Sequence, residues 1–508
     1  MNWFTIRPLV LAAVLALTGC HSPSGELLEG GRTPGATSTV AVRASLLVSA
    51  ELQQKPERNS PELTLALDFR QRAPERKLRV RWKGPQGLES DDTKPLEHRR
   101  LNLSVRKPPS GWPAGDYTIE IFLDGDSLKV IDFEIEADPN STVARLAKEV
   151  TANSTDDQAK VEAIFGWVAR NIDYDAAAFV SGDYGDCSAE AVLARRTGVC
   201  SGYANLFYAM AQTVGLEVEV IPGYARGYGL GEVDLDAPAN HAWNAVKLGG
   251  QWRLLDCTWG AGFLDERQAF IRRYEEFWLF TPPGQFARSH LPDEPRWQLL
   301  DKPISRQAFM DGAQVLPAFF KYGLDLGTHD QYQLASGSPL VLDIGCPEDV
   351  HLSAQLEGVE GRNVLVESRP GGQHIEVLFP RPGDYTLRIF AGPQSQTKLA
   401  QAVTYQVRAS QGDDRQFPEF YADYVKQGAR LSSPRAFRLF EGHPQEFRLS
   451  APGAQEVVLV GDDGQPRPLS QRGQEFTLDI TPPRGKLTIY ARYGEDRRMS
   501  GLVSFEVK

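Results

Sequence analysis

The sequence predicts a multidomain chain in which a mixed α+β domain lies between all-β sandwich modules. Length is the first indication, because 508 residues exceed what one hydrophobic core normally organises. The second is a change of hydrophobic period, from strand-like alternation before residue 136 to helical spacing after residue 154. The third is an internal repeat of about one hundred residues in the C-terminal part of the chain.

Composition and charge are those of an ordinary globular protein. Hydrophobic residues make up 41% of the chain and charged residues 24%. Acidic residues outnumber basic ones by 66 to 55, for a net charge of -11, and no Lys/Arg block stands out. Nucleic acid is therefore not an expected partner, because phosphate backbones are bound by clustered basic side chains.

Residues 1–20 are predicted to be a lipoprotein signal peptide. Arg7 supplies a short positive region, and residues 9–17 form an apolar run of about nine residues, too short for a membrane-spanning helix. The run ends in Leu-Thr-Gly-Cys at Cys20, which resembles a bacterial lipobox. That resemblance implies cleavage before Cys20 and lipidation of its thiol. An ordinary secretory signal with a chance cysteine is the alternative.

The segment that follows has the composition of a tether. Residues 21–38 are rich in Gly, Pro and Ser, which is typical of a flexible linker. We expect an extracytoplasmic protein held at the cell membrane by its lipid. His21, rather than Asp, follows Cys20, which favours the outer membrane if the host is Gram-negative. The other cysteines would lie in an oxidising compartment, with a pairing that the sequence leaves open: Cys187, Cys200, Cys257 and Cys346.

Residues 39–138 are predicted to form an N-terminal β-sandwich. Apolar and polar residues alternate in short runs separated by turn residues, at 63–67, 78–82 and 101–105. A final hairpin runs through 115–121 and 130–135, with a turn at Asp-Gly between them. Several short strands over about a hundred residues favour a sandwich.

Residues 139–304 read as a mixed domain that begins with helices. Ser154 or Thr155 is expected to cap a helix, and Asp156 and Asp157 in its first turn suit the helix dipole. One apolar face follows at helical spacing, formed by Val161, Ile164, Phe165 and Val168. This domain differs from both flanks and is the expected site of chemistry.

Two tandem sandwich modules are predicted at 305–408 and 409–508. Residues 317–320 align with 418–421, and 383–387 align with 485–489, at nearly the same spacing. Each copy is expected to run from a short aromatic helix into alternating strands. The Gly-Asp-Tyr-Thr string that opens the second marker also occurs at Gly115 in the N-terminal module.

The first chemical motif is Thr-Gly-Val-Cys-Ser-Gly-Tyr-Ala at 197–204. Apolar residues follow at helical spacing: Tyr203, Leu206, Phe207, Met210 and Val214. A helix is therefore expected to begin at or just after Cys200, with Gly198 as its breaker. Unpaired backbone N–H groups and the dipole at that end favour a thiolate, and the same donors can hold an oxyanion.

The second and third motifs, at 240–246 and 252–259, are predicted to pair as a hairpin. With its turn at Gly249 and Gly250, the hairpin puts His241 opposite position 258, so a diagonal contact or a bulge brings Asp256 within reach. A Cys–His pair with a carboxylate that orients the ring is the general arrangement for thiol nucleophilic catalysis. Cys257 is expected on the opposite sheet face, as packing or a disulfide half.

The hairpin also contains polar and aromatic residues without an assigned chemical role. Asn244 is interpreted either as a support for the hairpin or as a solvent-facing amide. The tryptophans are expected to be core residues and pocket walls rather than a cofactor site: Trp243, Trp252 and Trp259.

These three motifs resemble those of the transglutaminase-like superfamily, which shares a papain-like catalytic core. The resemblance rests on residues 198–204, 241–244 and 255–260, with a further similarity at 167–175, and it covers about residues 155–300. Bacterial members and the kyphoscoliosis-peptidase-like branch, which carries Ig-like modules after the core, resemble this sequence most. The resemblance implies Cys200 as nucleophile, His241 as general base and acid, and Asp256 as its partner.

The resemblance implies attack on an amide carbonyl and an acyl-enzyme intermediate, for which an amine acceptor gives transamidation and water gives hydrolysis. The residues do not choose between the acceptors. Protein or peptide amides, including those of peptidoglycan, are the expected substrates. A cysteine peptidase of the same fold is one alternative. A non-catalytic scaffold or adhesion lipoprotein is another, because some members of the superfamily have lost the triad.

No cofactor or metal is expected. The eight histidines form no HExxH motif, and neither a CxxC pair nor an EF-hand loop occurs in the sequence. The Gly-rich stretch at 223–231 lacks the Lys-Ser/Thr of a phosphate-binding loop. We interpret it as a substrate-gating loop.

Overall fold

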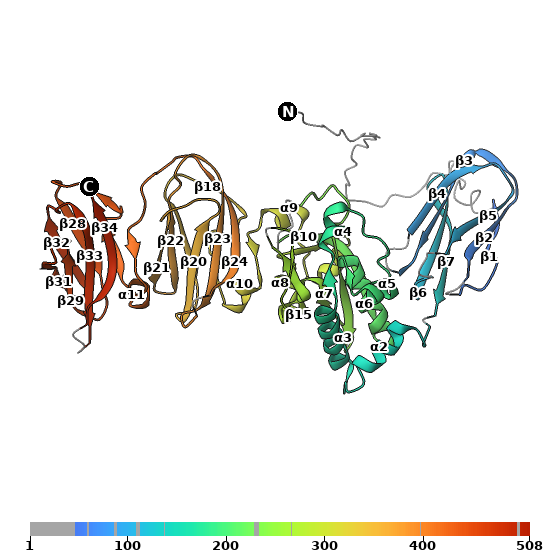
Figure 1. Cartoon of the computed structure of the whole chain (residues 1–508). Helices are drawn as coiled ribbons and strands as arrows, with labels where there is room; N and C mark the ends of the chain where they lie inside the picture. Colours follow the sequence, from blue (N-terminus) through green and yellow to red (C-terminus); the bar gives the residue numbers. More distant parts are fainter. Residues whose placement is uncertain are drawn as a thin grey trace, which may run out of the picture.

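The computed structural model describes residues 46–508, apart from 58–59, 86–88, 108–111, 137, 228–232, 266, 397 and 495–497. The predicted signal peptide, Cys20 and the tether lie outside the described residues. The N-terminal module, the central domain and the C-terminal modules follow one another in an elongated row (Figure 1). Among the described residues, no helix combines the length and the apolar character needed to cross a membrane.

The N-terminal module is built from two sheets whose strands alternate buried and exposed residues. One sheet has the order β1-β2-β5 and the other β4-β3-β6-β7. The strands are β1 (Leu47–Leu52), β2 (Glu62–Phe69), β3 (Ala73–Lys83), β4 (Glu89–Leu96), β5 (Arg100–Arg106), β6 (Gly115–Leu123) and β7 (Asp126–Ile135). Each predicted strand run lies inside one of them. Asp124 and Gly125 form the predicted turn and both have positive φ, at 51° and 91°.

The central domain packs helices against an antiparallel sheet of order β15-β12-β11-β10-β16. Its helices are α2 (Thr142–Val150), α3 (Asp157–Asn171), α4 (Ala176–Ser181), α5 (Ala189–Arg195), α6 (Cys200–Thr213), α7 (Cys257–Ala261) and α8 (Pro283–Phe286), with short 3₁₀ turns η2 (Glu276–Trp278) and η3 (Pro295–Gln298). The sheet strands are β10 (Val218–Ala225), β11 (His241–Leu248), β12 (Gln251–Leu255), β15 (Leu279–Thr281) and β16 (His290–Pro292). Short strand pairs complete it: β8 (Asp173–Tyr174) with β9 (Thr197–Gly198), and β13 (Gly262–Leu264) with β14 (Phe270–Arg272).

The cap predicted for α3 was wrong by one residue. Asp156, not Ser154 or Thr155, is the N-cap, because its carboxylate accepts a 2.8 Å hydrogen bond from the backbone N–H of Ala159. The apolar face predicted for this helix is confirmed, since Val161, Ile164, Phe165 and Val168 are all buried.

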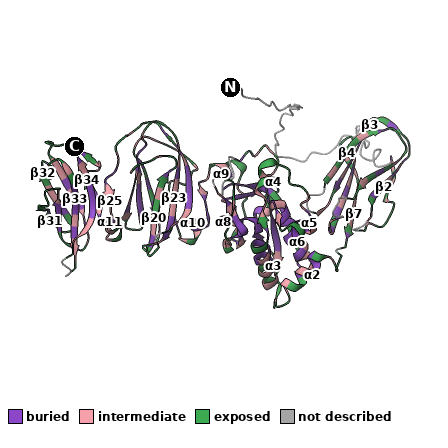
Figure 2. Cartoon of the chain, viewed as in Figure 1, coloured by how far each residue is buried: buried purple, intermediate pink, exposed green. Residues whose placement is uncertain are grey.

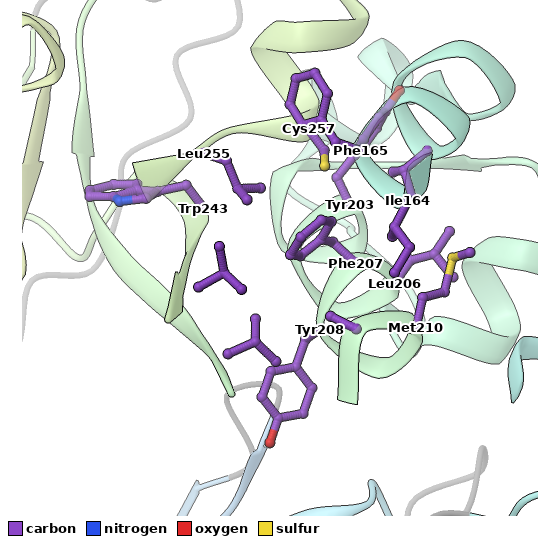
Figure 3. Packing of buried hydrophobic residues seen from close by; sticks show 14 of the residues in the cluster. Ile164, Phe165, Tyr203, Leu206, Phe207, Tyr208, Met210, Trp243, Leu255 and Cys257 are labelled. Atoms are coloured by element: carbon purple, nitrogen blue, oxygen red, sulfur yellow. The ribbon is translucent and has the colours of Figure 1, made fainter. Parts of the chain in front are cut away.

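The core of the central domain lies between α6 and the sheet. Side chains of α6 and α3 meet residues of β11 and β12 there, as Phe207, Phe165 and Leu255 do in the close view (Figure 3). Buried residues run along α3 and α6, as the view coloured by burial shows (Figure 2). At about 25 cal/mol per Å² of apolar surface removed from water, this packing is the main force that fixes α6 on the sheet.

The first C-terminal module has a sheet of order β17-β24-β23-β20, with β18 also on β24, facing a sheet of order β19-β22-β21. Two short helices, α9 (Arg306–Asp311) and α10 (Pro317–Lys321), precede or interrupt its strands. The strands are β17 (Gln314–Val315), β18 (Gln333–Ser336), β19 (Leu340–Gly345), β20 (Val350–Leu356), β21 (Val364–Arg369), β22 (Gly372–Val377), β23 (Gly383–Pro393) and β24 (Ala400–Ala409).

The second C-terminal module repeats this plan, with sheets of order β25-β34-β33-β29-β30 and β26-β28-β32-β31, and β27 also on β34. Its elements are β25 (Glu419–Phe420), α11 (Ala422–Lys426), β26 (Arg430–Ser433), β27 (Arg438–Leu439), β28 (Gln445–Ser450), β29 (Ala454–Val460), β30 (Pro466–Pro468), β31 (Ser470–Arg472), β32 (Glu475–Ile480), β33 (Gly485–Tyr493) and β34 (Ser500–Val507). The helix expected at 418–421 was misplaced, because Glu419 and Phe420 pair with β34 and the helix begins at Ala422.

The recurring glycine string marks an equivalent place in all three sandwiches. Gly115, Gly383 and Gly485 are the first residues of β6, β23 and β33. Their φ values of 127°, 156° and 120° lie in the region that favours glycine. The repeat read from the sequence therefore reflects a shared way of starting one long strand.

Arg226 joins the central domain to the first C-terminal module. The residue follows β10, and its buried guanidinium donates to the carbonyls of Met310 at 3.1 Å and Gly312 at 2.6 Å, which precede β17. It also lies over the ring of Phe309, 4.7 Å from the ring centroid. Burial lowers the pKa of this guanidinium to about 10, which still leaves it charged at neutral pH.

We expect Arg226→Ala to reduce the free energy of unfolding by about 3 kcal/mol, because it removes a buried guanidinium and leaves the part-buried carbonyls of Met310 and Gly312 without that donor. Urea unfolding followed by tryptophan fluorescence measures the effect. The matched control is Arg408→Ala, which removes an exposed ion pair with Asp384 and should leave the free energy of unfolding close to that of the wild type. Equal losses in the two variants would contradict this role for Arg226.

Candidate active site

Cys200 is the first residue of α6, as the sequence predicts. Val199 is the N-cap and provides no side-chain cap, so backbone N–H groups at this end stay available to a ligand. Gly198 and Gly202 let α5 approach closely, because a Cβ on them would lie 3.2 and 2.8 Å from a methyl carbon of Val192. The thiol is half-buried, accessible enough to meet a substrate.

His241 is the first residue of β11, the strand next to β12. The register pairs Asn244 with Leu255, which confirms the hairpin alignment predicted from the turn. His241 Nε2 lies 2.8 Å from Asp256 Oδ2. The predicted diagonal contact therefore forms, although β12 ends at Leu255 and Asp256 is the N-cap of α7 rather than a strand residue.

The Asp256 carboxylate is wholly buried and accepts hydrogen bonds at both oxygens. Oδ1 accepts from the backbone N–H groups of Thr258, at 2.7 Å, and Trp259, at 3.1 Å. Oδ2 accepts from Nε2 of His241 and, at 3.1 Å, from Nε2 of His290. Burial alone raises the pKa of this carboxyl group, but the two histidines outweigh burial and hold the pKa well below its usual range.

Because Asp256 is ionised, Nε2 of His241 must carry a proton, and Nδ1 is the ring nitrogen left for Cys200. Burial lowers the pKa of His241, but the Asp256 carboxylate and a hydrogen bond with the Cys200 thiol outweigh it and raise the pKa well above its ordinary value. The ring is thus suited to hold a proton taken from the thiol. The structure brings Cys200, His241 and Asp256 together in the predicted order.

His290 was not predicted. It opens β16, on the far side of β10 from β11, and its side chain is fully buried. Four aromatic rings lie around it, with centroids 4.1 Å (Phe286), 4.5 Å (Trp259), 5.1 Å (Trp243) and 5.3 Å (Trp278) away. Burial dominates and lowers the pKa of His290 to about 4. A lone histidine in Ser-His-Leu-Pro matches no motif, and only the pairing of β16 with β10 brings it to Asp256.

Asn244 is buried and ties α6 to the sheet, which decides between the two roles considered for it. Its amide donates to the carbonyl of Ala204 in α6 and to that of Glu219 in β10, both at 3.1 Å. The contact therefore fastens α6, which begins at Cys200, to β11, which begins at His241.

The other cysteines in the described part of the chain are free thiols. Cys257 begins α7 instead of lying on a sheet face, so its predicted placement was wrong; it is buried and unpaired by disulfide. Cys187 and Cys346 are half-buried, and burial raises the pKa of both. Among the described cysteines, no disulfide forms.

Among the described residues, one group of side chains that could hold a metal ion coincides with the candidate site. The relevant atoms of His241, Asp256 and His290 lie within 4.8 Å of one another. Two nitrogens at 2.8 and 3.1 Å from the same carboxylate oxygen have the geometry of N–H···O hydrogen bonds. A cation at this point would require both ring N–H protons to leave. We therefore treat the group as a hydrogen-bond network.

A wide cleft lies elsewhere, between the central domain and the first C-terminal module. Its volume is about 1900 Å³, and its walls include Gly227 and Glu275 of the domain and Gln314 and Gln401 of the module.

The stretch interpreted as a gating loop begins at Gly223, which belongs to β10. A Cβ at Gly223 would lie 2.4 Å from the Leu291 carbonyl oxygen. Residues 228–232 lie outside the described part.

A thiol at a helix N-terminus, packed on an antiparallel sheet that carries an imidazole, with a carboxylate just beyond the neighbouring strand, is typical of the papain-like and transglutaminase-like class of proteins. Residues 144–257 match the model of the transglutaminase-like superfamily, and residues 306–420 match that of the KY-like, immunoglobulin-like domain. The chain thus carries a transglutaminase-like domain followed by a KY-like Ig-like domain, and it matches the KY-like branch of the superfamily.

Curated relatives carry the name of the same branch. Kyphoscoliosis peptidase of Homo sapiens is 32% identical over 262 residues, which cover 49% of this chain and 38% of the relative. The Mus musculus protein is 30% identical over 336 residues, or 64% and 48% of the two chains. The chain therefore spans less than half the length of these relatives. Among solved structures, red sea bream transglutaminase aligns over 89% of this chain and 96% of its own, with 9% identity and a TM-score of 0.18.

Proposed function

We propose that the protein is a cysteine acyl-transfer enzyme that acts on protein or peptide amides through Cys200, His241 and Asp256. The observation that carries the proposal is the buried 2.8 Å contact between His241 and Asp256 beside a half-buried thiol at a helix N-terminus. The Cys200 thiol also lies close enough to the His241 ring to raise its pKa, which a purely structural imidazole–carboxylate pair would not require.

In the proposed reaction, Nδ1 of His241 takes the Cys200 proton, and the thiolate forms an S–C bond to the amide carbonyl carbon. Negative charge moves to the carbonyl oxygen, where N–H groups at the start of α6 can stabilise it. His241 then returns the proton to the departing nitrogen, the C–N bond breaks, and a thioester remains. An incoming amine or water attacks the thioester, His241 takes its proton, and the acyl group leaves the thiol.

The geometry of the triad is the same for transamidation and for hydrolysis. Hydrolysis is the second candidate, and the name of the curated relatives, kyphoscoliosis peptidase, favours it. The molecule that reaches the thioester, an amine or water, decides between transamidation and hydrolysis. A peptide amide can be the substrate of either reaction.

Incubation of the full chain with a glutamine-containing protein and a labelled primary amine, read by mass spectrometry, tests the proposal. Amine incorporation identifies a transferase, and peptide-bond cleavage or glutamine deamidation identifies a hydrolase. The control is Cys200→Ser. Products that persist in the control would contradict the role of Cys200. No product in either protein over a panel of substrates would contradict the proposal and favour a scaffold or adhesion role.

We further propose that Cys20 carries a lipid that holds the body at the cell membrane. The lipobox-like string at Cys20 and the Gly, Pro and Ser residues after it support this placement. Cells that express the full chain and are fed labelled palmitate should incorporate label into the protein, and Cys20→Ala should remove that label. Label that survives in Cys20→Ala would contradict the anchor. Cys346→Ala is the matched control and should label as the wild type does.

A further inference from the structure

His290 shares its acceptor with His241, and the reaction above leaves it without a function. Both Nε2 atoms approach the same oxygen of Asp256, at 3.1 Å for His290 and 2.8 Å for His241. His290 lies behind the carboxylate in a fully buried aromatic enclosure. A buried polar side chain in such an enclosure is expensive unless its hydrogen bonds are satisfied, so its contacts decide its role.

When the His290 ring is neutral, its contacts select one tautomer, because the Ser289 hydroxyl is closer to Nδ1, at 2.8 Å, than to the Phe286 carbonyl, at 3.4 Å. The ionised Asp256 requires a proton on Nε2, and Nδ1 then accepts from the Ser289 hydroxyl at 2.8 Å. The titratable groups that act on the ring are Asp256, from the end of β12, and His241, from β11. A second positive charge beside a protonated His241 is disfavoured by burial and by repulsion, in agreement with the lowered pKa of His290.

A neutral donor at this position has a definite consequence for Asp256. The backbone N–H groups of Thr258 and Trp259 hold Oδ1, while Oδ2 would otherwise have only His241 as a partner. During the proposed reaction His241 gains and loses its charge, and its attraction for Oδ2 changes with each step. A second N–H on Oδ2 that does not titrate keeps the carboxylate ionised and in one orientation throughout.

We propose that His290 is a positioning residue which, through its Nε2–H, holds Asp256 ionised and directed at His241. The proposal rests on the proposed function, since it concerns the same triad. It assigns His290 no contact with substrate, and it separates the role of the N–H donor from that of the aromatic packing around the ring.

The test is the rate of Cys200 alkylation by iodoacetamide as a function of pH, measured on the full chain by mass spectrometry, with Cys187 as internal reference. His290→Phe keeps an aromatic ring but removes the donor. We expect its alkylation rate at pH 6 to fall about tenfold and the acid limb of the profile to move up by roughly one pH unit. His290→Gln restores an N–H near the Nε2 position and should recover the rate to within about threefold of the wild type. Circular dichroism melting checks the fold of each variant.

Two results would show that His290 is only structural and would overturn the proposal. In the first, the pH profile of Cys200 alkylation shifts in His290→Phe and is not restored in His290→Gln. In the second, His290→Phe is less stable but its pH profile does not shift. If His290→Phe does not fold, Ser289→Ala provides the decision. That variant removes the donor to Nδ1 and should shift the acid limb in the same direction by a smaller amount, and an unchanged profile would overturn the proposal. A wild-type Cys200 that alkylates with the pH course of Cys187 would instead refute the proposed function, and the role of His290 with it.

Discussion

Replacing Cys200 with serine is expected to lower the rate of amide turnover by at least roughly 10⁴-fold. The serine hydroxyl occupies nearly the same place but is far less nucleophilic, and His241 cannot hold it in ionised form as it can a thiol. The thiol is half-buried and free, so the substitution should leave the fold intact. The measurement is initial rate on whichever amide substrate the amine-incorporation assay identifies, with circular dichroism melting as the check on folding.

The control for Cys200 is another thiol of the same domain. Cys187 is also half-buried, and burial raises its pKa, so Cys187→Ser should keep the wild-type rate within about twofold. His241→Ala complements the pair: it should slow alkylation of Cys200 near neutral pH by one to two orders of magnitude, roughly the effect expected of a lost general base. Turnover that survives in Cys200→Ser, or alkylation that ignores His241→Ala, would show that the thiol is not the nucleophile.

Asp256→Asn is expected to reduce turnover by roughly 10²- to 10⁴-fold, because it leaves His241 in the wrong tautomer. The new amide oxygen can still accept from the N–H groups of Thr258 and Trp259, so its NH₂ group faces both imidazoles. Nε2 of His241 must then become an acceptor, and the ring proton moves to Nδ1. A neutral imidazole protonated at Nδ1 cannot remove the Cys200 proton.

The same substitution also tests the charge of the network. His241 loses the carboxylate that raises its pKa, so it should release its proton at lower pH than in the wild type. Nuclear magnetic resonance titration of the imidazole measures this directly, and the sign is a shift toward lower pH. The control is Asp156→Asn at the exposed N-cap of α3, which should leave both rate and titration unchanged. Full activity in Asp256→Asn would contradict the orienting role.

Local signals in the sequence were enough for many elements. The alternation in the sandwich strands follows from a sheet with one buried face, and the start of α6 at Cys200 follows from Gly198 and the apolar spacing after it. The hairpin register followed from a turn at Gly249 and Gly250, both of which have positive φ. These features depend on residues close together in the chain, where steric and burial preferences act directly.

Errors occurred where local preferences were nearly balanced. Ser154, Thr155 and Asp156 are all good N-cap residues, and only the position of α3 in the core selects Asp156. Cys257 was expected in a strand because alternation continued past Leu255, but Asp256 caps α7 and ends β12 there. A two-residue pairing with β34 displaced the short helix expected near Glu419 in the same way.

The sequence by itself was enough to predict the order of the domains and the triad of Cys200, His241 and Asp256. The triad could be predicted because each of its motifs is contiguous and chemically distinctive. Only the tertiary structure decided what surrounds the triad. Asn244 fastens α6 to the sheet, and β16 brings His290 behind Asp256 from a sequence position without any motif. The physical reason is that a buried carboxylate must have every lone pair satisfied, and its donors come from strands and helices that meet only when the chain folds.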